Sequence, residues 1–294
     1  MMGAMPLPNP PTPVLSASVR RARGWWLAVA GAAALAAALY GAAMGWLWLE
    51  QEKLLFFPTI LPAQQVLAQE PDVREFGVDV PGARLSVLQL QLPSPKGVVF
   101  FLHGNGGSLS NWFVNTQLYR RANFDLVMMD YRGYGKSTGS IESEAQLRAD
   151  VRAVWAQVAA QYAGKRLVIY GRSLGTGLAS GLSVELAAQG HAPDLTVLVS
   201  PYSSMEALAG EQYPLVPSTV LRYPLRSIED VARLRSPLLL IHGDHDRLIP
   251  LHHSTALKAV APQAQLLVVE GAGHNDVHKF ESYLTGLGAA LSAL

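Results

Sequence analysis

Residues 166–189 read RLVIYGRSLGTGLASGLSVELAAQ, a short apolar run, a glycine-rich turn and a helix-forming stretch in immediate succession. The turn around Ser173 matches GxSxG in the strand–turn–helix context that gives this motif its meaning. Glycines two positions before and after the serine relieve backbone crowding, and the helix N-terminus favours a developing oxyanion. The stretch predicts Ser173 as a nucleophile; the alternative is a glycine-rich turn with an idle serine.

Strands and helices alternate from about residue 72 onward. Two runs with alternating polarity, VREFGVDV (73–80) and RLSVLQLQL (84–92), predict an antiparallel hairpin. Continuous apolar runs, typical of parallel strands buried on both faces, follow at 97–102, 124–129, 166–170, 195–200, 237–242 and 264–269. The clearest helix spans Ser143 to Tyr162. The pattern predicts a doubly wound, mostly parallel α/β sheet with an antiparallel N-terminal edge and chemistry at the carboxyl strand ends.

Two later strand ends carry the partners that a serine nucleophile needs. The run at 237–242 leads into GDHD (243–246), and the run at 264–269 leads into EGAGHND (270–276). Serine, aspartate, histidine is the chain order of a hydrolase triad on a sheet of this kind. We expect His274 to take the proton from Ser173; a surface histidine is the alternative. Spacing leaves Asp244 and Asp246 both open as the acid, while Asp276 is expected to be a solvated neighbour.

The strand at 97–102 opens into HGNGG (103–107). Acyl transfer needs two backbone N–H groups that face the tetrahedral oxygen. One is expected from Leu174, directly after the nucleophile, and the other from this glycine-rich loop. His103 itself fits a core-packed side chain equally well.

As an ordered set, these motifs resemble the α/β-hydrolase superfamily and, within it, the membrane-anchored alpha/beta-hydrolase domain-containing serine hydrolases. The matching segments are QEKLLFFP (51–58), FFLHGNGG (100–107), DYRGYGKSTG (130–139), YGRSLGTG (170–177), LLIHGDHDRLIP (239–250) and GAGHND (271–276). The resemblance covers about residues 51 to 280 and implies an α/β-hydrolase fold.

The resemblance also implies roles for individual residues. Carried over position by position, it implies the nucleophile Ser173, the acid Asp246, the base His274, and the oxyanion donors Asn105 and Leu174. It thereby favours Asp246 over Asp244, and it implies turn-forming rather than chemical roles for Asp130 and Arg132. Members of the group hydrolyse carboxylic esters, lysophospholipids or protein-bound acyl thioesters, so the resemblance implies the reaction and leaves the substrate open.

We therefore expect a serine hydrolase that cleaves acyl or lipid-like esters or thioesters through an acyl-enzyme. A serine peptidase or acyltransferase on the same fold, or a non-catalytic scaffold, are the alternatives. No cofactor or metal is expected, because the histidines at 242, 245, 252 and 253 match no recognised ligand spacing. Beyond residue 49 the chain has 20 basic and 22 acidic side chains, which does not support a nucleic-acid surface.

The N-terminal part predicts a membrane anchor. Trp25 to Leu49 is 25 residues without a charge, long enough to cross a bilayer, with tryptophan pairs near both ends. Arginines before it and Glu50 after it predict a cytoplasmic N-terminus and a domain on the outer, periplasmic or luminal side. A cleaved signal peptide is the alternative, although signal apolar regions usually span only about 7–15 residues.

These expectations divide the chain into four parts. They are a disordered, proline-rich and arginine-containing tail (1–24), a transmembrane anchor (25–49), a linker (50–71) and the hydrolase domain (72–294). Within the domain, a short cap is expected at about 201–236. Its apolar residues either line an acyl pocket or cover the core: Tyr213, Leu215, Val216, Val220, Leu221 and Tyr223. The expected partners are the membrane and a small-molecule or lipid acyl ester; nothing indicates an oligomeric state.

Overall fold

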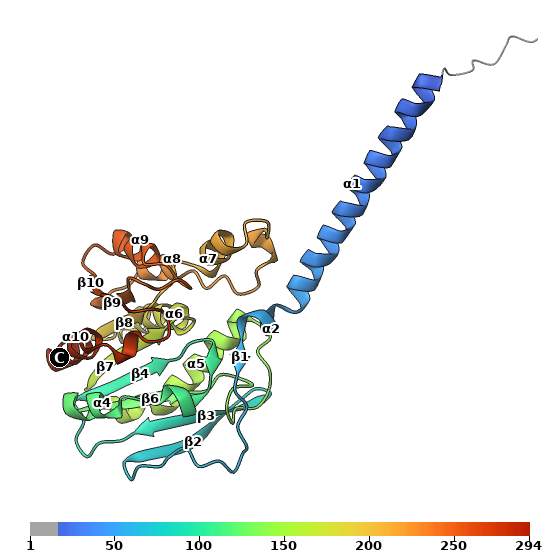
Figure 1. Cartoon of the computed structure of the whole chain (residues 1–294). Helices are drawn as coiled ribbons and strands as arrows, with labels where there is room; N and C mark the ends of the chain where they lie inside the picture. Colours follow the sequence, from blue (N-terminus) through green and yellow to red (C-terminus); the bar gives the residue numbers. More distant parts are fainter. Residues whose placement is uncertain (1–16) are drawn as a thin grey trace, which may run out of the picture. The chain divides into compact units, whose positions relative to one another are not determined.

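The computed structural model describes residues 17–294, which divide into two compact units with the boundary after Leu49 (Figure 1). In the first unit, helix α1 runs without interruption over Ala17–Leu49, and its part Trp25–Leu49 is long and apolar enough to cross a membrane. The predicted tail is wrong over residues 17–24, because alanine and arginine are good helix formers and extend the helix there. Residues 1–16 of the predicted tail lie outside the described residues.

The second unit is built on an eight-stranded sheet in the order β10-β9-β8-β7-β4-β6-β3-β2. The strands are β2 (Val73–Val80), β3 (Ala83–Leu90), β4 (Gly97–Leu102), β6 (Phe124–Met129), β7 (Arg166–Arg172), β8 (Leu195–Val199), β9 (Leu238–Gly243) and β10 (Gln265–Val269). Strand β3 is antiparallel to both of its neighbours, and all other pairs are parallel. The predicted mostly parallel sheet with an antiparallel N-terminal edge is confirmed.

Helices cover both faces of this sheet. On one face a core cluster joins the strands to α5 (Glu144–Ala159), α6 (Gly175–Ala188), α8 (Ser227–Val231) and α9 (His252–Val260). On the other face a second cluster joins them to α3 (Leu109–Trp112), α4 (Thr116–Ala122) and α10 (Glu281–Ser292). Because both faces are covered, every residue of β4 and β6 is buried, which explains their unbroken apolar sequences.

The segment predicted as a linker is instead part of the second unit in its first half. Helix α2 (Gln51–Leu55) is followed by β1 (Phe57–Pro58), which pairs in parallel with β5 (Gly106–Gly107). The Gln51 side chain donates to the Val220 carbonyl (3.0 Å), and Phe56 packs edge-on against Tyr223. Buried apolar and amide groups therefore fix this segment, and the compact unit begins at Glu50 rather than at residue 72. We call residues 50–61 the strap.

The region predicted as a cap contains three short helices. They are α7 (Met205–Gln212), η2 (Ser218–Val220) and α8. Two further single turns, η1 (Ala160–Tyr162) and η3 (Val277–Lys279), extend α5 and precede α10. The cap has no strand and no long helix, so it leaves the carboxyl ends of the central strands covered only by short segments.

Candidate active site

Ser173 lies on a sharp turn between β7 and α6 and has a positive φ of 52°, which costs energy for a residue with a side chain. Its two flanking glycines have no room for a Cβ. At Gly171 a Cβ would lie 2.5 Å from the Gly175 carbonyl oxygen, and at Gly175 it would lie 2.0 Å from the Leu102 carbonyl oxygen. The glycines thus allow the close packing that the turn requires, as the GxSxG motif predicts.

The structure brings Ser173, His274 and Asp246 into one chain of hydrogen bonds. His274 Nε2 lies 2.9 Å from Ser173 Oγ, and His274 Nδ1 lies 2.7 Å from Asp246 Oδ2. The second carboxylate oxygen, Oδ1, accepts the backbone N–H groups of Leu248 (3.0 Å) and Ile249 (2.8 Å). These bonds fix the carboxylate, so it orients the imidazole with Nε2 toward the serine.

The electrostatic surroundings keep Asp246 ionised. Burial alone would raise its pKa, but the His242 ring 3.5 Å away and hydrogen bonds with His274 and the Ile249 N–H hold the pKa of the carboxyl well below its usual range. His242 is itself fixed, because its ring nitrogens bond the Ile249 carbonyl and Ser254 Oγ, both at 2.7 Å. A negative charge is therefore available to stabilise an imidazolium at His274.

The other two aspartates lie outside this chain of bonds. Asp244 is exposed and accepts the backbone N–H of Gly271 at 2.7 Å. Asp276 is half-buried and accepts the backbone N–H of Gly273 at 2.8 Å, so it braces the turn before His274 instead of being merely solvated. The geometry thus distinguishes Asp246 from Asp244, which spacing alone left equivalent.

The loop HGNGG after β4 is held by hydroxyl groups from the DYRGYG segment. Tyr131 donates to the His103 carbonyl (2.8 Å), and Tyr134 donates to the Asn105 carbonyl (2.6 Å). Burial raises the pKa of both tyrosines, so both remain protonated donors. Asp130 accepts the Leu109 N–H at 2.9 Å, which agrees with a turn-forming role for this segment.

The two predicted oxyanion donors border the pocket above Ser173. Within residues 17–294, the backbone N–H groups of Asn105 and Leu174 donate to no carbonyl or side chain. Buried polar groups are normally hydrogen-bonded, and free N–H groups beside a nucleophile suit a developing oxyanion.

The strap contacts the Asn105 loop directly, which sequence reasoning missed. The Phe57 N–H donates to the Asn105 carbonyl (2.8 Å), and the Asn105 side chain donates to the Leu55 carbonyl (3.1 Å). The signal was present, because QEKLLFFP belongs to the set of motifs that carries the family resemblance. Its sequence, however, does not identify the Asn105 loop as the surface that the segment contacts.

Arg172 is a second residue that sequence reasoning missed. Its guanidinium lies 5.1 Å from the Trp112 ring and donates to the His274 carbonyl at 3.1 Å. It also lies 3.0 Å from His278 Nδ1, and burial together with the Arg172 charge lowers the pKa of His278 to about 4. A neutral His278 accepts from Arg172, so the arginine braces the loop that carries His274.

A pocket of about 280 Å³ lies above Ser173. The strap contributes Leu54, Leu55 and Phe57 to its lining, and the remaining apolar residues are Leu174, Tyr202, Met205, Leu208, Ala209, Tyr213, Leu248 and Ile249. Of the six apolar cap residues singled out in the sequence, all of them described, Tyr213 lines the pocket, whereas Tyr223 is buried in the core. An apolar pocket beside a nucleophile suits an acyl chain.

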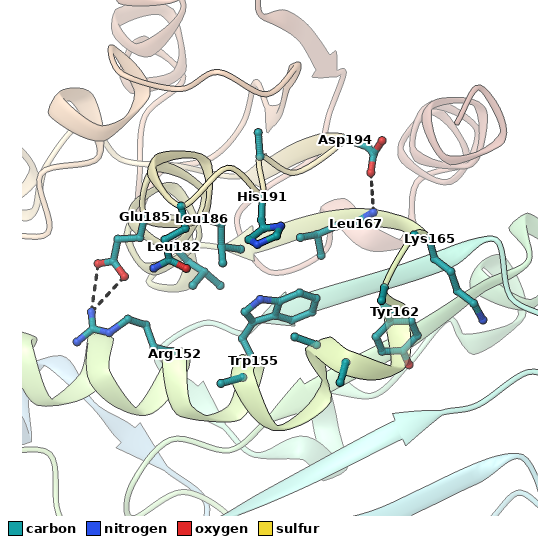
Figure 2. Close-up of a pocket in the computed structure, with 17 residues that line it drawn as sticks. Arg152, Trp155, Tyr162, Lys165, Leu167, Leu182, Glu185, Leu186, His191 and Asp194 are labelled. Carbon is teal, nitrogen blue, oxygen red and sulfur yellow. Dashed lines mark hydrogen bonds and ion pairs between the residues drawn. The ribbon is translucent and has the colours of Figure 1, made fainter.

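A larger cavity of about 630 Å³ lies between α5 and α6 (Figure 2). Trp155 and Leu186 form apolar parts of its wall, and Arg152 and Glu185 form an ion pair beside it. It adjoins Leu167 near the amino end of β7, whereas Ser173 follows the carboxyl end. None of the five predicted site residues is among the described residues that line it, so its size does not make it the reaction site.

Comparisons with known proteins agree with this architecture. The family model described as "Serine aminopeptidase, S33" matches residues 93–227, and the one described as "alpha/beta hydrolase fold" matches residues 195–280. Alpha/beta hydrolase domain-containing protein 17B is 35% identical in Xenopus laevis and 34% identical in Homo sapiens, over 201 residues in each case. The matched region covers 66% of this chain and 66% of each relative.

Solved structures match over a larger share of the chain. An esterase of Pyrococcus furiosus matches with a TM-score of 0.64 and 18% identity, covering 81% of this chain and 97% of that one. The thioesterase domain from the curacin biosynthetic pathway matches with a TM-score of 0.56 and 15% identity, covering 74% and 99%. At these identities the structural matches establish the fold alone.

Proposed function

The chain belongs to the α/β-hydrolase superfamily, and we propose that it is a membrane-anchored serine hydrolase that cleaves carboxylic esters or thioesters. The observation that carries this proposal is the unbroken chain from Ser173 Oγ through His274 to Asp246, beside two free backbone N–H groups. A scaffold that only binds has no need for all of these groups together.

The proposed reaction follows from the positions of these groups. Ser173 Oγ attacks the acyl carbonyl while its proton passes to His274 Nε2, and Asp246 stabilises the resulting imidazolium. The N–H groups of Asn105 and Leu174 bind the oxyanion. When the tetrahedral intermediate collapses, the bond to the leaving group breaks, and His274 returns the proton to that group. A water molecule then repeats the sequence on the acyl-enzyme and releases a carboxylic acid and free Ser173.

The apolar lining of the pocket favours an acyl chain as the part of the substrate that is bound. Leu54, Phe57 and Leu208 contribute hydrocarbon, and Gln212 is among the few polar side chains of the lining. The triad serves esters, thioesters and amides alike. A peptidase is the second candidate, because the description of one matching family model names an aminopeptidase.

The proposed location rests on helix α1. Trp25–Leu49 is long and apolar enough to span a bilayer, and the preceding arginines favour a cytoplasmic N-terminus with the domain on the outer side. A cleaved signal sequence fits the same helix. Tagging the N-terminus and finding the tag on the mature, membrane-bound chain distinguishes the anchor from a signal peptide.

A fluorophosphonate probe tests the enzymatic part of the proposal. We expect the full chain to be labelled, Ser173→Ala to lose labelling and turnover, and the exposed Ser110→Ala, as a matched control, to keep both. Labelling that survives Ser173→Ala in a folded protein contradicts the nucleophile assignment, and an unlabelled wild-type chain favours the scaffold. Matched ester, thioester and amide substrates of increasing acyl length then identify the preferred bond.

A further inference from the structure

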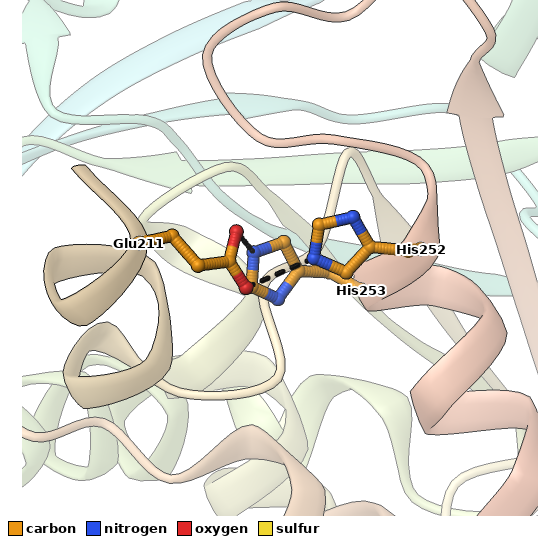
Figure 3. A group of neighbouring side chains, drawn as sticks. All are labelled: Glu211, His252 and His253. Atoms are coloured by element: carbon orange, nitrogen blue, oxygen red, sulfur yellow. Dashed lines mark hydrogen bonds and ion pairs between the residues drawn. The ribbon is translucent and has the colours of Figure 1, made fainter.

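Three side chains from two helices meet at the cap (Figure 3). Glu211 belongs to α7, and His252 and His253 are the first two residues of α9. Glu211 Oε1 lies 2.9 Å from His252 Nε2, and Glu211 Oε2 lies 3.5 Å from His253 Nε2. One nitrogen or oxygen from each residue falls within 4.8 Å of the others.

The buried member of this group has a polar atom that the surrounding protein does not satisfy. His253 is 1% exposed, and within the described part of the chain its Nε2 makes no hydrogen bond. A direct N–H···O bond to Glu211 requires about 2.7–3.2 Å, and the separation is 3.5 Å. Leaving a buried nitrogen unpaired is destabilising, so such an atom calls for a partner.

The other ring nitrogen of His253 shows how that partner can be bound. Nδ1 lies 3.0 Å from Ser203 Oγ and accepts the backbone N–H of Ser203 at 3.3 Å, which places the proton of the neutral ring on Nε2, facing Glu211. A metal ion at Nε2 would replace this proton, and the N–H would then be on Nδ1, where the Ser203 hydroxyl can accept it. Nε2 and the Glu211 carboxylate would both offer a lone pair to the ion. A metal-bound histidine typically donates its other N–H to such a neighbour.

We propose that Glu211, His252 and His253 bind a divalent transition-metal ion of the Zn²⁺ class, with water in the remaining position. Two imidazoles and one carboxylate are a recognised ligand set for this ion. Ligands in a tetrahedral zinc site lie roughly 3.4 Å apart, given bonds of about 2.1 Å, which is close to the observed separation of Glu211 and His253. The sequence did not predict this site, because Glu211 lies 41 positions before His252.

The site is placed to fix the cap wall of the pocket rather than to act on substrate. Helix α7 contributes Leu208 and Gln212 to the pocket lining, and α9 follows the loop that contributes Leu248. Besides the contact between Glu211 and His252, a hydrogen bond of 2.9 Å from the Gln212 side chain to the Leu248 carbonyl joins these parts. A metal ion would join α7 to α9 beside that bond and hold the acyl pocket in one shape. This consequence rests on the proposed function, whereas metal binding itself does not.

Direct metal titration tests the inference. The full chain, untagged, in detergent and stripped with a chelator, is titrated with Zn²⁺ by calorimetry, and Co²⁺ serves as a spectroscopic probe. We expect one ion per chain and a tetrahedral Co²⁺ spectrum. Glu211→Gln and His252→Ala each weaken binding about tenfold or more. Both residues are exposed, so these variants are expected to fold. The exposed His245→Ala is the matched control and keeps full affinity.

Two further measurements distinguish metal binding at this site from metal binding at the triad. Ser173→Ala binds Zn²⁺ like the wild-type chain, and Zn²⁺ raises the melting temperature of the wild type more than that of His252→Ala. The inference is overturned if the wild type takes up no stoichiometric ion. It is equally overturned if both ligand variants bind as tightly as His245→Ala, since the ion then sits elsewhere, for example at His274. Either result leaves the hydrolase proposal standing.

Discussion

The loops that carry the triad and the strap border the same pocket, but they are held in different ways. Ser173 and Asp246 are each 6% exposed, and side-chain hydrogen bonds fix both of them. On the strap, Leu54 is 44% exposed and Phe57 is 54% exposed, and the Leu55 carbonyl and the Phe57 N–H bond to Asn105. The groups proposed for the chemistry are thus buried, polar and fixed, whereas the part of the pocket wall that the strap contributes has partly exposed apolar side chains.

The sharpest test of the buried side compares two aspartates. Asp246→Asn removes the charge beside His274 and favours the wrong tautomer, so kcat should fall by about 10⁴, the value known for the equivalent change in a serine protease. Asp244→Asn should leave kcat nearly unchanged, because Asp244 bonds only a backbone N–H in its turn. Steady-state kinetics on a soluble ester measures both. A reversed order of the two effects would make Asp244 the acid.

The role of the exposed strap is tested by comparing a soluble substrate with one embedded in a membrane. A chain that begins at Glu50 keeps the strap, so its kcat/KM on short soluble esters should match that of the full chain. On an acyl ester embedded in vesicles its rate should fall about 10²-fold, because the anchor no longer concentrates the enzyme at the bilayer. Both chains are compared at equal active-site titre. Equal rates of the two chains on the vesicle substrate would show that contact with a membrane does not explain the exposed residues of the strap.

The Asn105 loop contacts the strap and borders the pocket beside Ser173, and the Tyr134 hydroxyl group helps to hold this loop. Tyr134→Phe removes the donor to the Asn105 carbonyl, so the predicted oxyanion loop loses a restraint and kcat should fall about tenfold with KM little changed. Tyr162→Phe is the matched control, because its hydroxyl bonds Asp125 and Gln89 in a different part of the molecule. Both variants should lose about 1 kcal/mol of unfolding free energy. A similar loss of kcat in the control would show that the effect is one of general stability.

The smallest expected effect concerns the loop behind His274. The pKa of His278 is lowered to about 4, so between about pH 6.5 and 4 the unfolded chain binds a proton that the folded chain does not. Unfolding free energy should therefore decrease as the pH falls through this window. In His278→Gln, which keeps an acceptor for Arg172, this decrease should be shallower. Denaturant unfolding at pH 7 and pH 5 measures it, and parallel slopes for both proteins would contradict the assignment.

The sheet was predictable because strands that are buried on both faces have unbroken apolar sequences. FDLVMM and GVVFFL are predicted strands whose bounds the structure reproduces. The GxSxG turn was equally readable, since its conformation demands glycines at fixed positions. The juxtaposition of Ser173, His274 and Asp246 follows from strand order, which the motifs imply.

The remaining features depend on contacts between distant segments. The link from Phe57 to Asn105 joins residues 48 positions apart, and no local pattern specifies it. Arg172 occupies a variable position of GxSxG, just before Ser173. Because the motif allows many residue types there, it does not predict a role for this arginine. The Glu211 group combines two helices with unrelated sequences. In each case the interaction forms because the fold brings distant segments into contact, and no periodic pattern in the sequence predicts it.

The first residues of the strap also determine how a mechanical load would pass from the proposed anchor to the compact unit that follows it. A pull along the chain beyond Leu49 meets Gln51 first, which is bonded to the Val220 carbonyl and to the Arg222 N–H, and then Glu52, which accepts the Tyr223 hydroxyl. These bonds would bear tension before it reached Phe57 and the Asn105 loop. If residues 25–49 form the proposed anchor, a lateral force from the bilayer would load these bonds to the cap before it reached Asn105, one of the two proposed oxyanion donors.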